Sequence, residues 1–333
     1  MSRWTSASSE SPERGVAVVA CPDSLKGVLS AADAARALAE GFRRAGVAVD
    51  EAPVADGGEG TAAAFHAAFG GEWRPAVVSD PLGRPVEARF LLLPDGRAVL
   101  EAAEAIGLRR LAPEELDPLR ATSRGLGELI SAALEAGARG LVVGLGDTAT
   151  IDGGAGLRAV LQELPVPTAV ACDVANPLLG ERGAARVFGP QKGASAEQVE
   201  ELERRLAAME ELVPYAALPG AGAAGGLGAA LAALGASLVP GAELVAAAVG
   251  LRGRLEGAAL AVTGEGMVDR TSLEGKATGV VAALCAELGV RCVVFGGRVE
   301  EALPGAETIA LSGDPARARA DLADLGERLA RGL

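Results

Sequence analysis

Short apolar runs rich in β-branched residues alternate along the chain with longer segments of helical periodicity. Five such runs lie near the two ends of the chain: 16–20, 47–54, 259–263, 292–295 and 308–311. Between the first two runs, the segment 30–45 has helical spacing, and Ser30 is placed to cap it. This alternation is typical of β-α-β units and predicts one doubly wound parallel sheet built from both termini. We expect the runs at 16–20 and 259–263 to be adjacent strands of that sheet.

The middle of the chain has a different pattern. Three apolar runs, at 76–79, 86–93 and 98–101, follow one another closely and are joined by turns that contain proline and glycine. This spacing is typical of an antiparallel meander. Two further runs, at 140–144 and 168–172, predict buried strands between helical segments. The whole pattern predicts two α/β domains, a discontinuous one formed by 1–57 and 241–333 and a mixed α/β domain inserted at 58–240.

Composition and charge narrow the functions that this fold can serve. Half of the 333 residues are apolar, so the chain can form a substantial core, and the formal net charge is -13. An acidic protein of this kind is not expected to bind nucleic acid or an anionic membrane surface. An anionic substrate must therefore be held by a local cluster of hydrogen-bond donors and cations.

No segment predicts export or membrane insertion. The uncharged stretch 212–242 contains seven glycines and is broken by Pro219 and Pro240, so we expect a buried loop and helix there. Residues 1–14 are polar and lack the apolar core of an export signal. The four cysteines have no metal-binding spacing and lie in or beside apolar runs, which indicates reduced, buried thiols. These features predict a cytoplasmic protein, and the single histidine, His66, argues against zinc chemistry or a Ser-His-Asp triad.

Lysine is rare in this chain, and each lysine adjoins a glycine. Of 31 basic residues only three are lysines, Lys26, Lys192 and Lys276. A compact ammonium is not interchangeable with a planar guanidinium where space around a phosphate is tight, so these positions are candidate phosphate or carboxylate contacts. Because glycine is abundant here, a chance association is the alternative. Asn176, the single asparagine, follows a predicted strand close to Asp173 and is either part of a ligand-binding loop or a turn residue before proline.

Three glycine-rich segments with acidic residues follow predicted strands, at 56–61, 146–154 and 263–266. Glycines let the backbone approach a ligand closely, and the N-terminus of a following helix offers free N–H groups to an anion. Carboxylates at such a site need a bridging Mg²⁺ to accept an anion. Because ligands bind at the carboxyl ends of strands in open α/β sheets, we expect one crevice facing the inserted domain. Lysines, carboxylates and glycine-rich loops without a histidine base suit phosphoryl transfer.

These motifs in this order resemble the glycerate kinase type 1 family, the bacterial ATP-dependent kinases of D-glycerate. The resemblance extends from about Val16 to Gly297 and rests on eight segments: 22–27, 55–61, 80–84, 121–130, 173–178, 189–193, 222–228 and 263–266. It implies a flavodoxin-like domain with an inserted restriction-enzyme-like α/β domain and a site in the cleft between them. It also implies ATP and Mg²⁺ as cofactors, a small hydroxy acid as substrate and phosphoglycerate, usually the 2-phosphate, as product. A homodimer is compatible with this resemblance.

The residues quoted above give a candidate site. We expect catalytic roles for Lys26, Asp56, Asp173 and Lys192, with Asp56, Asp173 and Asp152 as candidate metal ligands. Expected substrate contacts are Ser24, Arg84, Asn176 and Gln191, with Arg84 either a carboxylate clamp or a turn-surface arginine. Expected nucleotide contacts are Gly146, Thr148, Gly225, Gly226, Glu265 and Lys276.

Several positions depart from the family pattern. In the loop 146–154, Asp147 stands where the pattern has glycine and Ile151 where it has asparagine. Met267 and Thr271 replace the usual arginine and glutamine, and the segment between Gly156 and Asp173 is tens of residues shorter than in relatives. Two alternatives therefore stand beside a D-glycerate kinase. One is a kinase of another small hydroxy acid, and the other is a regulator that binds a nucleotide or acid without turnover.

Overall fold

The computed structural model describes residues 18–273 and 276–333, and the predicted polar tail at 1–14 lies outside them. The described chain forms two compact units. Unit 1 contains the described residues up to Asp56 together with Ala63–Ala68 and Ala242–Leu333, and unit 2 contains Gly57–Ala62 and Phe69–Gly241.

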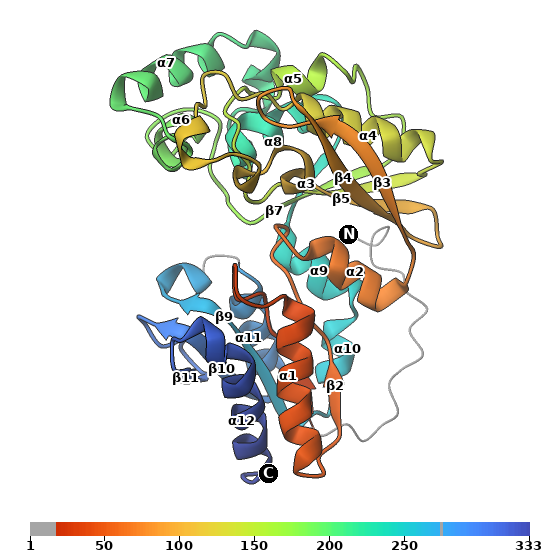
Figure 1. The fold of residues 1–333 in the computed structure, drawn as a ribbon, viewed down its shortest axis with the longest axis vertical. Helices are drawn as coiled ribbons and strands as arrows, with labels where there is room; N and C mark the ends of the chain where they lie inside the picture. Colours follow the sequence, from red (N-terminus) through yellow and green to blue (C-terminus); the bar gives the residue numbers. More distant parts are fainter. Residues whose placement is uncertain (1–17, 274–275) are drawn as a thin grey trace. The chain divides into compact units, whose positions relative to one another are not determined.

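Unit 1 is built on a five-stranded, all-parallel sheet (Figure 1). Its strands are β1 (Val18–Ala20), β2 (Val49–Glu51), β9 (Leu260–Val268), β10 (Arg291–Val299) and β11 (Glu307–Ala310). Their order, β2-β1-β9-β10-β11, is the flavodoxin order 2-1-3-4-5, which confirms the predicted fold class. The predicted pairing of the first strand with the run near 260 is confirmed, because Val18 is in register with Leu260.

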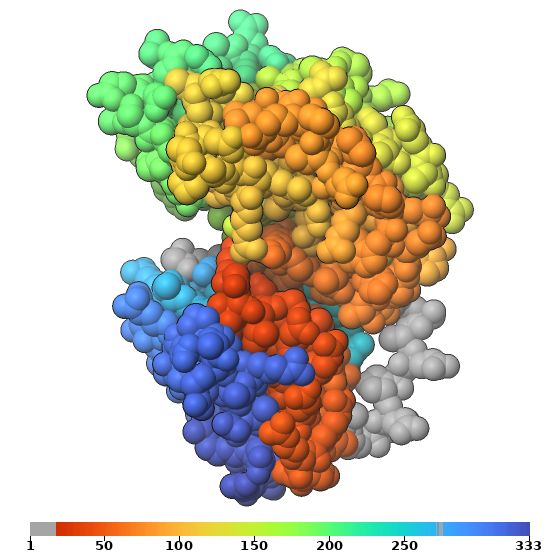
Figure 2. Space-filling model, viewed as in Figure 1, coloured from red at the N-terminus to blue at the C-terminus, as the bar shows by residue number. Residues whose placement is uncertain are grey.

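Helices cover this sheet, and the two longest pack tightly against each other. α1 (Ala31–Arg44) begins as predicted at Ser30, whose hydroxyl accepts a hydrogen bond from the Asp33 amide. α1 and α12 (Ala318–Ala330) meet along their length, as the adjoining red and dark-blue surfaces show (Figure 2). Glycine makes this approach feasible, since a Cβ on Gly41 would lie 1.9 Å from the Ala323 carbonyl oxygen. The other helices of unit 1 are α9 (Gly241–Ala248), α10 (Leu251–Leu255), α11 (Ala277–Leu288) and the 3₁₀ segments η5 (Arg270–Leu273) and η6 (Pro315–Arg317).

Strands β9 and β10 extend beyond their predicted ends. The motif 263–266 was expected to form a turn after a strand, but it continues β9, with Glu265 paired to Gly296. The glycines explain the difference, since they let the two backbones run close together where a side chain would not fit. A Cβ on Gly264 would lie 2.1 Å from the Phe295 carbonyl oxygen. Glu265 is therefore held by a rigid strand and not by a loop.

Unit 2 contains a six-stranded sheet in the order β3-β4-β5-β6-β7-β8. The strands are β3 (Glu72–Ser79), β4 (Pro85–Leu92), β5 (Arg97–Glu101), β6 (Gly140–Gly144), β7 (Thr168–Cys172) and β8 (Ser237–Pro240). The first three are antiparallel, as predicted, and the remaining pairs are parallel. β8 was not predicted. It lies in the uncharged stretch 212–242, where α8 (Ala223–Ala233) supplies the expected buried helix.

The remaining elements of unit 2 are mostly short. They are α3 (Ala102–Ile106), α4 (Arg124–Glu135), α5 (Ala155–Arg158), α6 (Ala184–Phe188), α7 (Ala196–Ala207), η1 (Leu108–Arg110), η2 (Pro113–Glu115), η3 (Pro190–Lys192) and η4 (Glu210–Tyr215). α2 (Thr61–Phe69) begins in unit 2 and contributes Ala63–Ala68 to unit 1. Within the described ranges, no helix is both long and apolar enough to cross a bilayer, and all four cysteines are buried free thiols, as predicted.

Candidate active site

Three buried carboxylates lie in the part of unit 1 where its central strands end. Asp23 follows β1, Asp56 follows β2, and Glu265 lies in β9, the strand beside β1. Their exposed fractions are 8%, 9% and 8%. The Asp23 amide donates to the Gly264 carbonyl oxygen at 2.9 Å, which fixes the segment after β1 against β9. Parallel strands thus bring together acidic groups from residues 23, 56 and 265 at the carboxyl edge of the sheet, where open α/β sheets bind their ligands.

The charge of this carboxylate cluster is only partly compensated. Burial raises the pKa of Asp23 well above its usual value, and the negative charges of Asp56 and Glu265 raise it further. The Ser24 amide, which donates to Asp23 Oδ1 at 2.6 Å, and the charge of Lys26 act in the opposite direction. The Lys276 ammonium lies 3.3 Å from Glu265 Oε2, whereas Glu265 Oε1 is buried with no hydrogen-bond partner in the described structure. Such a cluster favours a cation or a donor-rich ligand.

In unit 2, Lys192 is a buried amine that holds the loop 146–154. It is 3% exposed, and its Nζ donates to Thr148 Oγ1 at 3.2 Å and to the Thr150 carbonyl oxygen at 2.9 Å. Burial lowers the pKa of Lys192 to about 7, against the opposing charges of Asp152 and Asp147. A neutral amine has two N–H donors, and both acceptors are present. The protonated form has a third N–H, which is available to donate a hydrogen bond to an anionic ligand.

The same loop is anchored by Asp152 and by the glycines of α8. Asp152 accepts four hydrogen bonds, from the Ser123 amide and hydroxyl and from the amides of Gly154 and Gly156. These bonds give Asp152 a structural role within the loop. Gly225 has φ +71°, and a Cβ there would lie 2.0 Å from the Thr150 carbonyl oxygen, so glycine is required by backbone packing. Its neighbour Gly226, with φ +96°, also packs against this loop.

The loop 146–154 also packs against the glycine-rich segment that begins at Gly57. A Cβ on Gly146 would lie 2.5 Å from Gly58 Cα, and one on Gly144 would lie 2.4 Å from the Gly57 carbonyl oxygen. Asp147 has φ +55°, a left-handed conformation that favours glycine. This agrees with the glycine of the family pattern at this position. The chain therefore accepts local backbone strain to present a carboxylate here.

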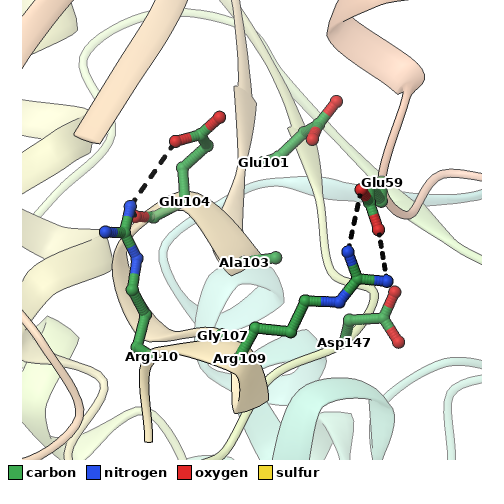
Figure 3. A pocket seen from close by; sticks show the side chains of 8 residues that line it. All are labelled: Glu59, Glu101, Ala103, Glu104, Gly107, Arg109, Arg110 and Asp147. Atoms are coloured by element: carbon green, nitrogen blue, oxygen red, sulfur yellow. Dashed lines mark hydrogen bonds and ion pairs between the residues drawn. The ribbon is translucent and has the colours of Figure 1, made fainter. Parts of the chain in front are cut away.

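That carboxylate lines a pocket of about 130 Å³ in unit 2, most of whose lining residues are charged (Figure 3). The other lining residues are Glu59, Glu101, Ala103, Glu104, Gly107, Arg109 and Arg110. Arg109 binds Glu59 through its two terminal guanidinium nitrogens, Nη2 at 3.1 Å and Nη1 at 3.2 Å. Glu101, the last residue of β5, accepts hydrogen bonds from the amides of Gly60 and Ala62. Burial is the main reason that the pKa of Glu101 is raised to about 7.

The other residues expected to contact substrate have local partners or lie at the surface. The Arg84 guanidinium binds Asp80 and Glu115, each at 2.5 Å, and behaves as the turn arginine considered above. The Asn176 side chain donates to the Arg182 carbonyl oxygen at 2.7 Å and fixes its own turn. Asp173 is half-buried after β7, and Gln191 is exposed.

The structure thus gathers the expected residues into two groups. Unit 1 contains Ser24, Lys26, Asp56, Glu265 and Lys276, and unit 2 contains Gly146, Thr148, Asp152, Lys192, Gly225 and Gly226 around one loop. Asp23 and Glu101 were not predicted. Asp23 lies three residues after β1, inside the quoted motif 22–27, and this position could have indicated it. Glu101 had no such signal beyond its place at a strand end.

The carboxylates of the described residues can hold a metal ion only together with other ligands. Among the described residues, no three His, Cys, Asp or Glu side chains are arranged to hold a metal ion by themselves. Mg²⁺ usually binds through one or two carboxylates together with substrate phosphates and water. The unpartnered Glu265 Oε1 beside Asp23 fits that kind of incomplete site.

A flavodoxin-like sheet with carboxylates and lysines at its carboxyl edge, in a chain with a second α/β unit that carries glycine-rich loops, suits a phosphotransferase that acts on a small molecule. The comparisons agree with this class. The model of the Glycerate kinase family matches residues 18–164 and 160–313. Glycerate 2-kinase of Escherichia coli K12 is 42% identical over 301 residues, which cover 78% of this chain and 79% of that protein.

Other relatives point the same way. Glycerate kinase of Bacillus subtilis 168 is 40% identical over 301 residues, again covering 78% of this chain and 79% of that protein. A crystal structure from Salmonella typhimurium LT2, described as a candidate glycerate kinase 2, superposes with a TM-score of 0.82 at 34% identity. It covers 95% of this chain and 97% of its own. The chain belongs to the glycerate kinase family and is an enzyme of the kinase class.

Proposed function

We propose that this enzyme transfers the γ-phosphoryl group of ATP to a hydroxyl of D-glycerate, forming the 2-phosphate, as in the type 1 branch of the family. The observation that supports this most is the buried cluster of Asp23, Asp56 and Glu265 beside Lys26 and Lys276, in a chain of this family. In the transfer, the substrate oxygen forms a bond to the γ-phosphorus, the bond to the β–γ bridging oxygen breaks, and the hydroxyl proton leaves for a base.

The side chains divide into three roles. Asp23 and Glu265 would hold Mg²⁺, which supplies charge neutralisation to the phosphates when bound. Asp56 accepts the proton of the attacking hydroxyl, because two carboxylates are enough for the metal and a third remains as base. Lys26, which is exposed, and Lys276 offer ammonium groups to phosphate oxygens. In unit 2, Lys192 keeps the loop 146–154 in place through Thr148 and Thr150.

An assay of ADP release with ATP and Mg²⁺ tests this function over a panel of small hydroxy acids. D-Glycerate should be the preferred acceptor, and ³¹P NMR of the product should show the 2-phosphate. Asp56→Asn should abolish most turnover while Mn²⁺, used as a paramagnetic probe of the Mg²⁺ site, still binds. Glu265→Gln should weaken Mn²⁺ binding. Turnover in Asp56→Asn close to that of the unmodified enzyme would remove Asp56 from the mechanism.

One observation favours a second candidate, a kinase of a different small hydroxy acid. Asp147 places a carboxylate in the left-handed position of the loop 146–154, where the family pattern has glycine. The family resemblance implies that this loop lines the site, and a negative charge added there disfavours an acceptor carboxylate and favours an acceptor with a neutral or cationic substituent. The same panel distinguishes the two, because Asp147→Gly should then shift the preference toward D-glycerate.

A further inference from the structure

Glu101 is a largely buried carboxylate that the roles above do not use. It ends β5 and reaches across to the beginning of α2, which lies some 40 residues earlier in the chain. Its Oε1 accepts hydrogen bonds from the Ala62 amide at 2.8 Å and from the Gly60 amide at 3.1 Å. These amides are among the N–H groups that a helix N-terminus leaves without intrahelical partners. Gly60 has no side chain that could cap α2, so Glu101 of β5 provides the cap.

The segment that Glu101 binds is otherwise weakly constrained by its own residues. Gly57 and Gly60 have φ of +99° and +96°, which glycine adopts without cost but which also leaves the free chain many alternatives. Contacts from outside must therefore select one conformation. Gly57 packs against Ala171, and Glu59 is bound by Arg109 at the rim of the same pocket. Glu101 makes the two charge-assisted bonds at the C-terminal end of this segment.

We propose that Glu101 is a positioning residue for phosphoryl transfer, which fixes the segment Asp56–Thr61 by binding its amides and so holds Asp56 in place. This inference rests on the role of Asp56 in the proposed function. Asp56 begins the segment whose other end Glu101 holds. A misplacement of about 1 Å at a reacting group can lower a rate by about 10²-fold.

The charge of Glu101 makes this role dependent on pH. The charged residues that line the pocket with Glu101 are Glu59, Glu104, Asp147, Arg109 and Arg110. Burial, together with the charges of Glu104 and Glu59, raises the pKa of Glu101 to about 7. Below that pH the side chain is a neutral acid and a weaker acceptor for the two amides. The turnover number of the unmodified enzyme should therefore rise with pH through about 7.

The test compares Glu101→Gln with Glu104→Gln, the same substitution of another pocket carboxylate that binds no amide of the segment. Glu101→Gln should lower kcat at least about tenfold at pH 8, and its kcat should lack the rise near pH 7. Glu104→Gln should retain the turnover and the rise, with the midpoint of the rise moved to lower pH because one neighbouring negative charge is lost. A Glu101→Gln enzyme with unchanged kcat, or with the rise near pH 7 intact, would overturn the proposal.

Hydrogen–deuterium exchange provides a readout that needs no substrate. In Glu101→Ala the amides of residues 57–62 should exchange about tenfold or more faster, because two charge-assisted bonds are lost. Unchanged exchange there would also overturn the proposal. If the exchange changes as expected while the unmodified enzyme does not turn over D-glycerate, the positioning contact stands and the proposed substrate fails.

Discussion

The buried amine of Lys192 makes a measurable contribution to the pH dependence of stability. In the folded protein its pKa is lowered from 10.5 to about 7, whereas in the unfolded chain it returns to about its ordinary value. Between these pH values the unfolded chain holds one proton more than the folded protein, so the free energy of unfolding rises with pH. The slope approaches about 1.4 kcal/mol for each pH unit but is only half of that at pH 7, where the folded amine is still half protonated. The gain from about pH 7 to about pH 9 is therefore about 2 kcal/mol.

Lys192→Met removes this gain, because methionine fills a similar volume and carries no proton. The difference in unfolding free energy between the unmodified protein and the variant should therefore widen by about 2 kcal/mol over this pH range. Urea unfolding followed by tryptophan fluorescence measures it. Trp73 lies on β3 in unit 2, so a Trp4→Phe background confines the signal to the unit that contains Lys192.

The matched control is Lys26→Met, the same chemical change at an exposed lysine. Its unfolding curve should stay parallel to that of the unmodified protein at every pH. If the Lys192→Met curve also stays parallel, Lys192 is not held as a neutral amine and its two hydrogen bonds to the loop 146–154 must be made by an ammonium.

Three further outcomes follow from the geometry. Lys26→Arg should change the free energy of unfolding by less than about 0.5 kcal/mol yet lower kcat by about 10²–10³-fold. Lys192 is only 3% exposed, so Lys192→Arg should also destabilise the fold by about 1–3 kcal/mol. A Lys192→Arg protein as stable as the unmodified one would contradict this. Asp23→Asn should raise the urea midpoint at pH 8, since burial disfavours the carboxylate, and it should abolish most turnover. Asp80 is the opposite case, because hydrogen bonds from Arg84 and Leu82 outweigh its burial and lower its pKa. Asp80→Asn should therefore lower the midpoint. Gly225→Ala should lower the free energy of unfolding by at least about 3 kcal/mol, because the new Cβ would meet the Thr150 carbonyl oxygen. Gly235 has φ +95° but open space around it, so Gly235→Ala should lower it by only about 1 kcal/mol. Equal urea midpoints for the two variants would refute the close contact at Gly225.

The elements that could be predicted best are those whose secondary structure and bounds depend on their own residues. β6 and β7 have the predicted bounds, 140–144 and 168–172, because every residue in them is buried and all but Thr168 are apolar. Ser30 caps α1 as expected, since a side-chain oxygen one residue before a helix satisfies a nearby amide. The carboxyl-edge rule for parallel sheets correctly brought Asp56 and Glu265 to one cluster.

The misses occurred where a distant part of the chain decides. The extension of β9 through Gly264 and Glu265 depends on β10, whose backbone comes too close for any side chain at Gly264. The close backbone contact of Gly225 and Gly226 with the loop 146–154 was not foreseen, and their expected contact with the nucleotide stays a prediction. Glu101 caps a helix that begins some 40 residues before it, and no local spacing reports such a bond.

The strand order of unit 1 has a consequence for how the chain folds. β1 has β2 on one side and β9 on the other, and β9 lies more than 200 residues further along. During synthesis the first two strands are made long before their partner, and they cannot complete a sheet until the C-terminal segment emerges. Unit 2, almost continuous in sequence, has no such delay. If unit 2 folds first, it shortens the flexible connection that must close between β1 and β9, which lowers the entropy lost in that closure. Until then the apolar segment 18–20 is exposed to other chains, and this period is when the protein is most open to aggregation.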